Sequence, residues 1–321
     1  MGEMNKLSTY AWTPDSDKII RISKSTLDNY SNWCAQQLWL SKVCPQEEKD
    51  HDYLTIGSNV HDRQEEFYHI AKKNKLFIEE AIDHAKQGND KRAFEILMSL
   101  YPESTGEYAD RESPMQEWLV RNDVLRLKHC DTPDDWLPVG NELDLDALID
   151  VEINLGTKDE PIMETHRVHL RGIIDRIFSD GNDGVALMEL KTGKWRAQYD
   201  VPKMKGEMAY YAYVLDESGA GEELGPVTHW GWRYPGADHW DYMKATKVSI
   251  TAMKKRLAKL VKSYVQQDFP VVSDRETYKC GYCDYQRFCP KWTVYANPIE
   301  VANGAEIILK TGEEMERESR A

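Results

Sequence analysis

The hydrophobic pattern divides the chain into a mainly helical first part and a later part in which strands and helices alternate. Apolar residues recur at helical spacing in three early segments, residues 25–40, 58–74 and 77–100. Ser58 or Asn59 can cap the second helix, and Gly88 interrupts the third. The Pro- and Asp-rich residues 130–140 predict a loop.

Alternating and β-branched apolar residues then predict three strands, over residues 147–155, 167–179 and 185–190. Residues 180–184 (Asp-Gly-Asn-Asp-Gly) are typical of a tight turn, so the last two strands are expected to be antiparallel neighbours. The pattern continues with a helix, two short strands and a long amphipathic helix, at residues 203–217, 228–233, 240–242 and 246–267. This order predicts an α/β layered core with helical additions.

Length, charge and hydropathy narrow the class of protein. The 321 residues can form one large domain or two small ones. No run approaches 18 apolar residues, and the polar first residues do not resemble a signal peptide, so we expect a cytoplasmic protein without membrane contact. A net charge of −14 argues against a broad basic surface for nucleic acid. It does not exclude a nuclease, because metal-binding carboxylates count as negative in this sum. The chain has no GxxxxGK[ST] loop, which argues against a helicase or ATPase.

Two carboxylates end apolar runs in neighbouring predicted strands. Asp175 closes one apolar run, and Glu189 closes the next, followed by Leu190 and Lys191. Strand alternation puts Glu189 and Lys191 on one face. Because charges at the end of a buried strand need partners, a bound Mg²⁺ or Mn²⁺ would suit both carboxylates. Lys191 would then orient or deprotonate the attacking water and stabilise charge on a phosphate. The alternative is a hairpin with ordinary surface charges.

A histidine is the candidate third ligand. His61 is expected in the first turn of its helix, with Glu65 four residues later on the same face. A single helical histidine is more often a surface residue or one bonded to protein neighbours. Arg176, beside Asp175, is expected on the opposite face of the strand in a structural role.

The six cysteines favour metal ligation over disulfides. The chain is long, has no secretory signal, and concentrates three cysteines as Cys280-x₂-Cys283-x₅-Cys289. Three thiolates need a fourth ligand, and this spacing is compatible with zinc and with a [4Fe–4S] cluster.

Three motifs together resemble a known family. Gly57-x-x-x-His61, then Gly172-Ile-Ile-Asp175-Arg176, then Glu189-Leu-Lys191-Thr-Gly, in this order, resemble the RecB-like branch of the PD-(D/E)XK nuclease superfamily. The resemblance covers roughly residues 20–292. It implies a restriction-endonuclease-like α/β core, a central mixed sheet flanked by helices, with N-terminal helical additions and a C-terminal iron–sulfur segment. By this resemblance the metal ligands are His61, Asp175, Glu189 and the carbonyl of Leu190, and the catalytic residues are Lys191, Glu189 and Asp175.

The family's Gln-x-x-x-Tyr motif has an altered counterpart here, Glu207-Met-Ala-Tyr-Tyr211. Tyr211 fits, and both residues are implied DNA contacts. A carboxylate at position 207 would repel phosphate unless it binds a second cation or is protonated. Lys194 and Arg196 flank Trp195 after the catalytic strand and are further candidates for DNA contact. The alternative is a solvated charged face with one packed tryptophan.

The resemblance also favours iron over zinc. Iron–sulfur nucleases of this branch, including the CRISPR-associated exonuclease family, have one cysteine in an N-terminal helix and three near the C-terminus. Leu27-x-x-Tyr30-x-x-x-Cys34 is similar to that N-terminal segment. The implied cluster ligands are Cys34, Cys280, Cys283 and Cys289. Cys44 is the second choice for the first position, and Cys130 is expected to be a plain thiol.

The resemblance implies a metal-dependent DNA exonuclease acting on single-stranded or frayed ends. The implied setting is recombination, repair, or phage or CRISPR DNA processing in a prokaryotic or virus-infected cell, with a helicase, a recombinase or a CRISPR-adaptation protein as partner. The expected domains are an N-terminal extension (1–22), the nuclease domain (23–292) and a C-terminal tail (293–321). A non-catalytic iron–sulfur or zinc protein that binds DNA or scaffolds a complex is the alternative.

Overall fold

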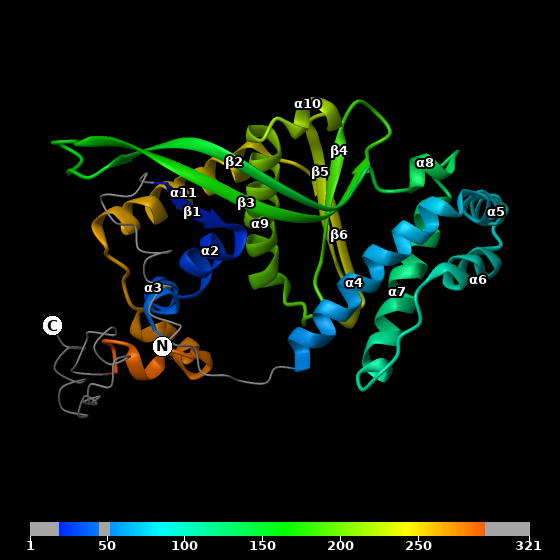
Figure 1. Ribbon diagram of the computed structural model, residues 1–321, viewed down its shortest axis with the longest axis horizontal. Coiled ribbons are helices and arrows are strands. Elements are labelled where there is room, and N and C mark those ends of the chain that lie inside the picture. Colours follow the sequence, from blue (N-terminus) through cyan, green and yellow to red (C-terminus); the bar gives the residue numbers. More distant parts are fainter. Residues whose placement is uncertain (1–18, 45–51, 293–321) are drawn as a thin grey trace, which may run out of the picture. The chain divides into compact units, whose positions relative to one another are not determined.

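The computed structural model describes residues 19–44 and 52–292, which form two compact units (Figure 1). The first unit contains residues 19–44, 148–170 and 252–292, and the second contains residues 52–147 and 171–251. The predicted tail, and residues 1–18 of the predicted extension, lie outside the described residues. None of the described helices is long and apolar enough to cross a membrane.

The second unit is built on a mixed sheet, which confirms the predicted α/β architecture. Strand β2 (Gly140–Asn154) pairs with β3 (Met163–Ser179), and β3 runs antiparallel to β4 (Val185–Leu190). Strand β4 runs parallel to β5 (Val227–Tyr234), which is antiparallel to β6 (His239–Lys244). The turn before β4 forms as predicted, because the Asp180 carboxylate accepts a hydrogen bond from the Asn182 amide at 2.8 Å.

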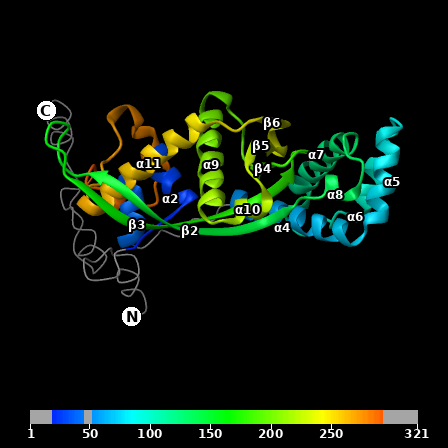
Figure 2. The same cartoon turned by 90° about the horizontal axis from the view of Figure 1, so that it is seen from above.

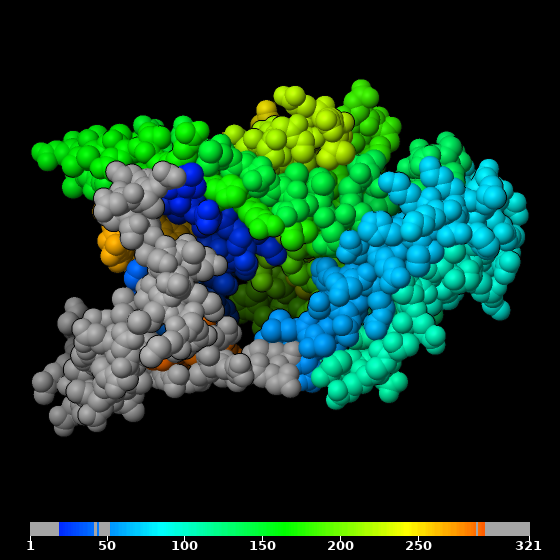
Figure 3. All heavy atoms as spheres, viewed as in Figure 1, coloured from blue at the N-terminus to red at the C-terminus, as the bar shows by residue number. Residues whose placement is uncertain are grey.

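Helices flank this sheet. They are α4 (Asp52–Lys73), α5 (Lys75–Lys86), α6 (Asp90–Leu100), α7 (Ala109–Leu127), α8 (Pro133–Trp136), α9 (Ala197–Glu217) and α10 (Ala220–Leu224). Figure 2 shows α9 beside β4 and β5, which it contacts. In the space-filling view, the helices of residues 52–127 (blue to cyan) lie against the sheet (green) (Figure 3).

Two predicted element boundaries need correction. Helix α4 begins at Asp52, so Ser58 and Asn59 are interior residues and His61 is not in the first turn. The early start is explained by Ile56, which is buried at helical spacing from Val60. The predicted loop 130–140 contains the short helix α8, which the side chains of Thr132 and Asp135 cap. The predicted break near Gly88 is confirmed.

A second-unit core packs the helices onto the sheet. Phe67 and Tyr68 of α4 lie among Tyr101, Trp136 and Phe178, with ring centroids 4.8 Å apart for Phe67 and Tyr101. Next to this core, Leu190 of β4 packs against Ile56, Val60 and Leu119. Packing therefore fixes α4 against the end of β4.

The first unit holds the cysteine-rich segment. It contains β1 (Ile20–Ser23), α2 (Lys24–Asp28), a π-helical turn η1 (Asn29–Trp33), α3 (Ala35–Val43), most of α11 (Lys247–Gln266), and the 3₁₀ segments η3 (Asp274–Tyr282) and η4 (Gln286–Phe288). The single helix predicted over 25–40 is wrong, because Cys34 is extended (φ −153°, ψ 118°) and separates η1 from α3. Tyr30 contacts α11, with its hydroxyl 2.8 Å from that of Ser263.

Candidate metal centre and active site

Successive side chains at the end of β4 point to opposite faces of the sheet, one apolar and one charged. The side chains of Met188 and Leu190 pack into the hydrophobic clusters formed with α4 and α7. Glu189 and Lys191 take the other face, where Lys191 meets Glu207 of α9. A fully buried strand therefore delivers two charged residues to one place beside α9.

Asp175 on β3 is fixed against the end of β4. Its side chain is buried, and Oδ2 accepts a hydrogen bond of 2.7 Å from the backbone amide of Leu190. The bond couples the position of the carboxylate to that of the Leu190 peptide. Oδ1 faces His61, whose Nδ1 is 3.7 Å away.

His61 joins the aspartate to the backbone of β4. Its Nε2 lies 3.1 Å from the carbonyl oxygen of Leu190. The imidazole can reach both groups because Val60, its neighbour on α4, packs against Leu190 in the hydrophobic cluster. Three of the predicted metal ligands, His61, Asp175 and the Leu190 carbonyl, thus meet at one point.

Glu142 of β2 is a member of this site that the sequence analysis did not identify. One donor atom each from His61, Glu142 and Asp175 lies within 4.8 Å of the others. Burial raises the pKa of Glu142, and the Asp175 carboxylate raises it further, although a 2.7 Å bond from Arg176 opposes the rise. The predicted strand began at residue 147, whereas β2 begins at Gly140, so Glu142 fell outside the expected sheet.

The donor set fits a hard divalent cation. Carboxylate and carbonyl oxygens with one imidazole suit Mg²⁺ or Mn²⁺. Two neighbouring carboxylates that are partly or fully buried also repel each other, and a cation would relieve that repulsion. Glu189, the remaining predicted ligand, lies beside Lys191 and does not join the group of donor atoms formed by His61, Glu142 and Asp175.

Lys191 lies between two carboxylates. Its Nζ donates a hydrogen bond to Glu189 and lies 3.1 Å from Oε2 of Glu207. Burial opposes the charged form, but the carboxylates of Glu189, Glu207 and Asp175 hold the pKa of Lys191 well above its ordinary value. The side chain is therefore a positioned ammonium group at neutral pH.

Glu207, the residue that departs from the family motif, has a clear local partner. It is buried on α9, and its second oxygen lies 3.8 Å from Nζ of Lys203. Its carboxylate thus faces two lysines. Tyr211, one turn later, is buried against Gly172, where an added Cβ would come within 3.0 Å of the ring.

Residues 194–196, which follow β4, include two exposed cations and one packed tryptophan. Lys194 and Arg196 are exposed. Trp195 stacks on His239, with ring centroids 4.1 Å apart, and contacts Tyr234. Trp195 is therefore packed against neighbouring rings, as the alternative interpretation of this segment expected. Lys194 and Arg196 remain accessible to a ligand.

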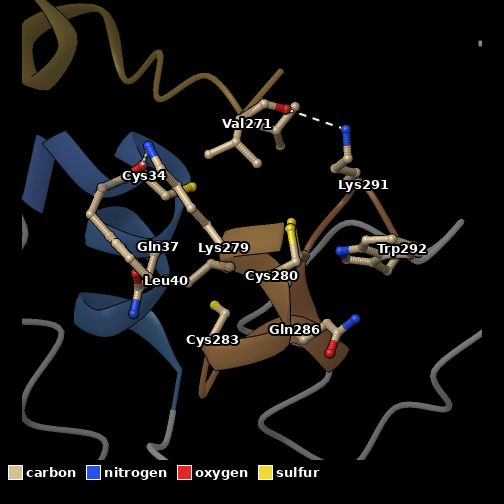
Figure 4. A pocket seen from close by; sticks show the side chains of 13 residues that line it. Cys34, Gln37, Leu40, Val271, Lys279, Cys280, Cys283, Gln286, Lys291 and Trp292 are labelled. Atoms are coloured by element: carbon tan, nitrogen blue, oxygen red, sulfur yellow. Dashed lines mark hydrogen bonds between the residues drawn. The ribbon is translucent and has the colours of Figure 1, made fainter. Parts of the chain in front are cut away.

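Four cysteines line one pocket of the first unit. Figure 4 shows Cys34 beside the N-terminal helices on one side of this pocket and, on the other side, Cys280 in η3 and Cys283 directly after η3; Cys289 also lines it. The Lys279 ammonium donates to the carbonyls of Asn32 (3.1 Å) and Trp33 (3.2 Å), so it ties the backbone before Cys34 to the residue before Cys280.

The other two cysteines lie elsewhere. Cys44 packs beside this pocket, against the cluster that contains Leu40 and Phe288, and is not part of its lining. Cys130 belongs to the second unit, where its thiol donates to the Arg126 carbonyl at 3.3 Å.

Comparisons with known proteins identify a family for this chain. Comparison with curated proteins gives no match. Similar solved structures include one described as "Crystal structure of SSO0001", with 11% identity and a TM-score of 0.37 over 89% of this chain and 93% of that chain. A family model described as "PD-(D/E)XK nuclease superfamily" matches residues 21–290, which include the sheet, His61, Asp175 and the Glu189-Leu190-Lys191 triplet. The chain therefore belongs to the PD-(D/E)XK nuclease superfamily.

Proposed function

We propose that this nuclease is a metal-dependent DNA exonuclease of the RecB-like type, acting on single-stranded or frayed ends. The observation that supports it is the meeting of His61, Asp175 and the Leu190 carbonyl at the end of the strand that also carries Lys191. Family membership supports nuclease chemistry, and the ordered motifs support the RecB-like branch.

The residues of the site divide the work of phosphodiester hydrolysis. His61, Asp175, Glu189 and the Leu190 carbonyl would hold Mg²⁺ or Mn²⁺, which when bound polarises the phosphate and lowers the pKa of water. Lys191 keeps its proton and donates hydrogen bonds that orient the attacking water and stabilise negative charge on the phosphate. Attack at phosphorus expels the 3′-oxygen and leaves a 5′-phosphate.

The charge distribution favours a substrate held near the site rather than along a broad surface. The chain carries a net charge of −14, which would repel long stretches of duplex. The exposed Lys194 and Arg196 directly follow the catalytic strand and would contact the backbone of a single strand. Such local attraction suits DNA ends, and we place the enzyme in recombination, repair, or phage or CRISPR DNA processing beside a helicase, recombinase or adaptation protein.

We also propose that Cys34, Cys280, Cys283 and Cys289 hold a [4Fe–4S] cluster. All four cysteines line one pocket, which supports a shared metal site. The similarity of Leu27-x-x-Tyr30-x-x-x-Cys34 to the N-terminal segment of iron–sulfur nucleases favours a [4Fe–4S] cluster over zinc.

The nuclease proposal is tested with purified protein, Mn²⁺ and end-labelled DNA in linear and circular, single- and double-stranded forms. We expect short products from linear single strands, intact circles, and loss of cleavage in Asp175→Asn and Lys191→Met. Asp150→Asn, which neutralises an exposed aspartate, is the matched control. Undiminished cleavage by both site variants would refute the site, and cleavage of circles would replace the exonuclease by an endonuclease.

The cluster proposal is tested by anaerobic purification. We expect a brown protein with about four irons per chain, loss of iron in Cys34→Ser and retention of iron in Cys44→Ser. A colourless protein that contains zinc would overturn the cluster, and iron loss only in Cys44→Ser would move its first ligand.

A further inference from the structure

Glu142 combines three features that the motifs of the chain do not explain. Its backbone has a positive φ of 49° within β2, a conformation that non-glycine residues rarely adopt. Its carboxylate is half-buried and within 4.8 Å of donor atoms of both His61 and Asp175. It also accepts a 2.7 Å hydrogen bond from Arg176, which is buried.

We propose that Glu142 is a direct ligand of the active-site cation and that Arg176 is its positioning residue. This inference rests on the proposed function. It adds a carboxylate from β2 to a ligand set that the motifs draw only from α4, β3 and β4.

Electrostatics favours this role over a purely structural ion pair. If Glu142 served only as an ion-pair partner of Arg176, its place beside Asp175 would be unfavourable. The two carboxylates repel each other, and this repulsion weakens the ion pair between Glu142 and Arg176. The same proximity is useful when a cation binds both carboxylates. Arg176 bonds to Oε1 of Glu142, and a carboxylate has a second oxygen that can bind a cation at the same time.

The surroundings of Arg176 suit a positioning role. Its side chain is 3% exposed, and its guanidinium lies 5.4 Å from the ring centroid of Tyr68, a core residue of α4. Such a packed cation has little freedom to move, so it holds the carboxylate in one orientation. Groups that orient metal ligands in this way typically change metal affinity about 10- to 100-fold when they are removed.

The different contacts of Glu142 and Glu189 support a ligand role for Glu142. Glu189 is bonded to Lys191, whereas Glu142 lies with His61 and Asp175. Glu142 can therefore bind a cation without breaking the contacts that hold the lysine.

The test is Mn²⁺ binding to DNA-free protein, measured by electron paramagnetic resonance of the free ion. We expect Glu142→Gln to weaken binding at least about tenfold, the size of effect that loss of a single supporting group already produces. Glu65→Gln is the matched control, because Glu65 acts on Glu142 through its charge but lies outside the group of donor atoms. Its affinity should stay within about twofold of wild type.

Glu142→Gln weakens the ion pair of the buried Arg176 and could therefore destabilise the fold. A second pair of variants separates this effect from the loss of a metal ligand. Arg176→Met should retain measurable Mn²⁺ binding, and Arg176→Met with Glu142→Gln should lose a further factor of about ten. Wild-type affinity in Glu142→Gln, or equal weakening in Glu142→Gln and Glu65→Gln, would overturn the inference. Unchanged Mn²⁺ binding in Asp175→Asn would instead remove the metal site on which the proposed function rests.

Discussion

Replacing Glu207 by glutamine would test how the Lys191 ammonium group is held. Glu207 is 4% exposed, and its Oε2 lies 3.1 Å from Nζ of Lys191. Glutamine has the same shape and keeps an oxygen that accepts a hydrogen bond, so the substitution removes charge and little else. It also produces the glutamine of the RecB-like Gln-x-x-x-Tyr motif, which residues 207–211 resemble.

The expected loss of stability follows from this geometry. At an effective dielectric constant of about 20, unit charges 3.1 Å apart attract by about 5 kcal/mol. The cost of burying both groups offsets part of this, and breaking a buried pair typically costs about 3–5 kcal/mol. Because Lys191 keeps Glu189 as a partner and glutamine keeps a hydrogen bond, we expect a loss of about 2 kcal/mol.

The assay is urea unfolding of metal-free protein at neutral pH, followed by tryptophan fluorescence. Lys203→Met is the matched control, because Lys203 lies 3.8 Å from Glu207 and is 40% exposed, so its loss should cost less than about 1 kcal/mol. Cleavage by Glu207→Gln should remain within about tenfold of wild type, since Lys191 stays bonded to Glu189. A variant as stable as wild type would refute the view that Glu207 anchors the lysine.

Three further predictions concern the frame around the site. Gly172→Ala should lower the free energy of unfolding by about 1–3 kcal/mol, because the new Cβ would meet the Tyr211 ring at 3.0 Å; an unchanged urea midpoint would contradict it. Asp123→Asn should cost about 3–5 kcal/mol, since it breaks the buried 2.9 Å pair with Arg233; a thermal midpoint within 2 °C or so of wild type would argue against this. Burial opposes ionisation of Glu112, but hydrogen bonds from neighbouring side chains hold its pKa below the ordinary value. Its stabilising effect is therefore present above the unfolded pKa of about 4.3 and is lost as the pH falls through the folded value. The stability difference between wild type and Glu112→Gln should shrink between pH 7 and pH 3, and a difference independent of pH would be the contrary result.

The elements that local sequence signals define were predictable. The turn at residues 180–184 contains Asp and Gly at the positions that a tight connection needs, so the antiparallel pairing of β3 and β4 followed from the chain itself. The order of His61, Asp175 and Glu189-Leu190-Lys191 then predicted the site, because Glu189 and Lys191 come at the end of a buried strand and Asp175 lies on the strand paired with it.

Other elements depend on contacts between distant residues. Helix α7 was not predicted because polar residues occupy part of its buried face, among them Glu112, Gln116 and Asp123. Glu112 and Asp123 are buried because partners elsewhere in the fold donate hydrogen bonds to them, as Asn59 does to Glu112 at 2.7 Å and Tyr68 does to Asp123 at 2.9 Å. Helical periodicity of apolar residues cannot reveal such a helix.

Glu142 was missed for a related reason. It sits at a backbone irregularity near the start of β2, and its place beside His61 depends on the register of strands that the local pattern does not determine. A positive φ at a glutamate also gives no signal in the sequence, because glycine or asparagine is the usual residue at such positions. Only the assembled sheet brings this carboxylate to the site.

The charges of the site together explain why a glutamate is tolerated at position 207, where the RecB-like motif that this segment resembles has glutamine. Four carboxylates that are buried or partly buried gather here, on Asp175, Glu142, Glu189 and Glu207. The two low-exposure cations paired with them belong to Lys191 and Arg176. Four carboxylates and two cations leave a net charge of −2 at the site, which one bound divalent cation would balance. Glu207 faces Lys191 at 3.1 Å and stabilises the ammonium group beside Glu189, whereas glutamine would leave that group with less opposite charge.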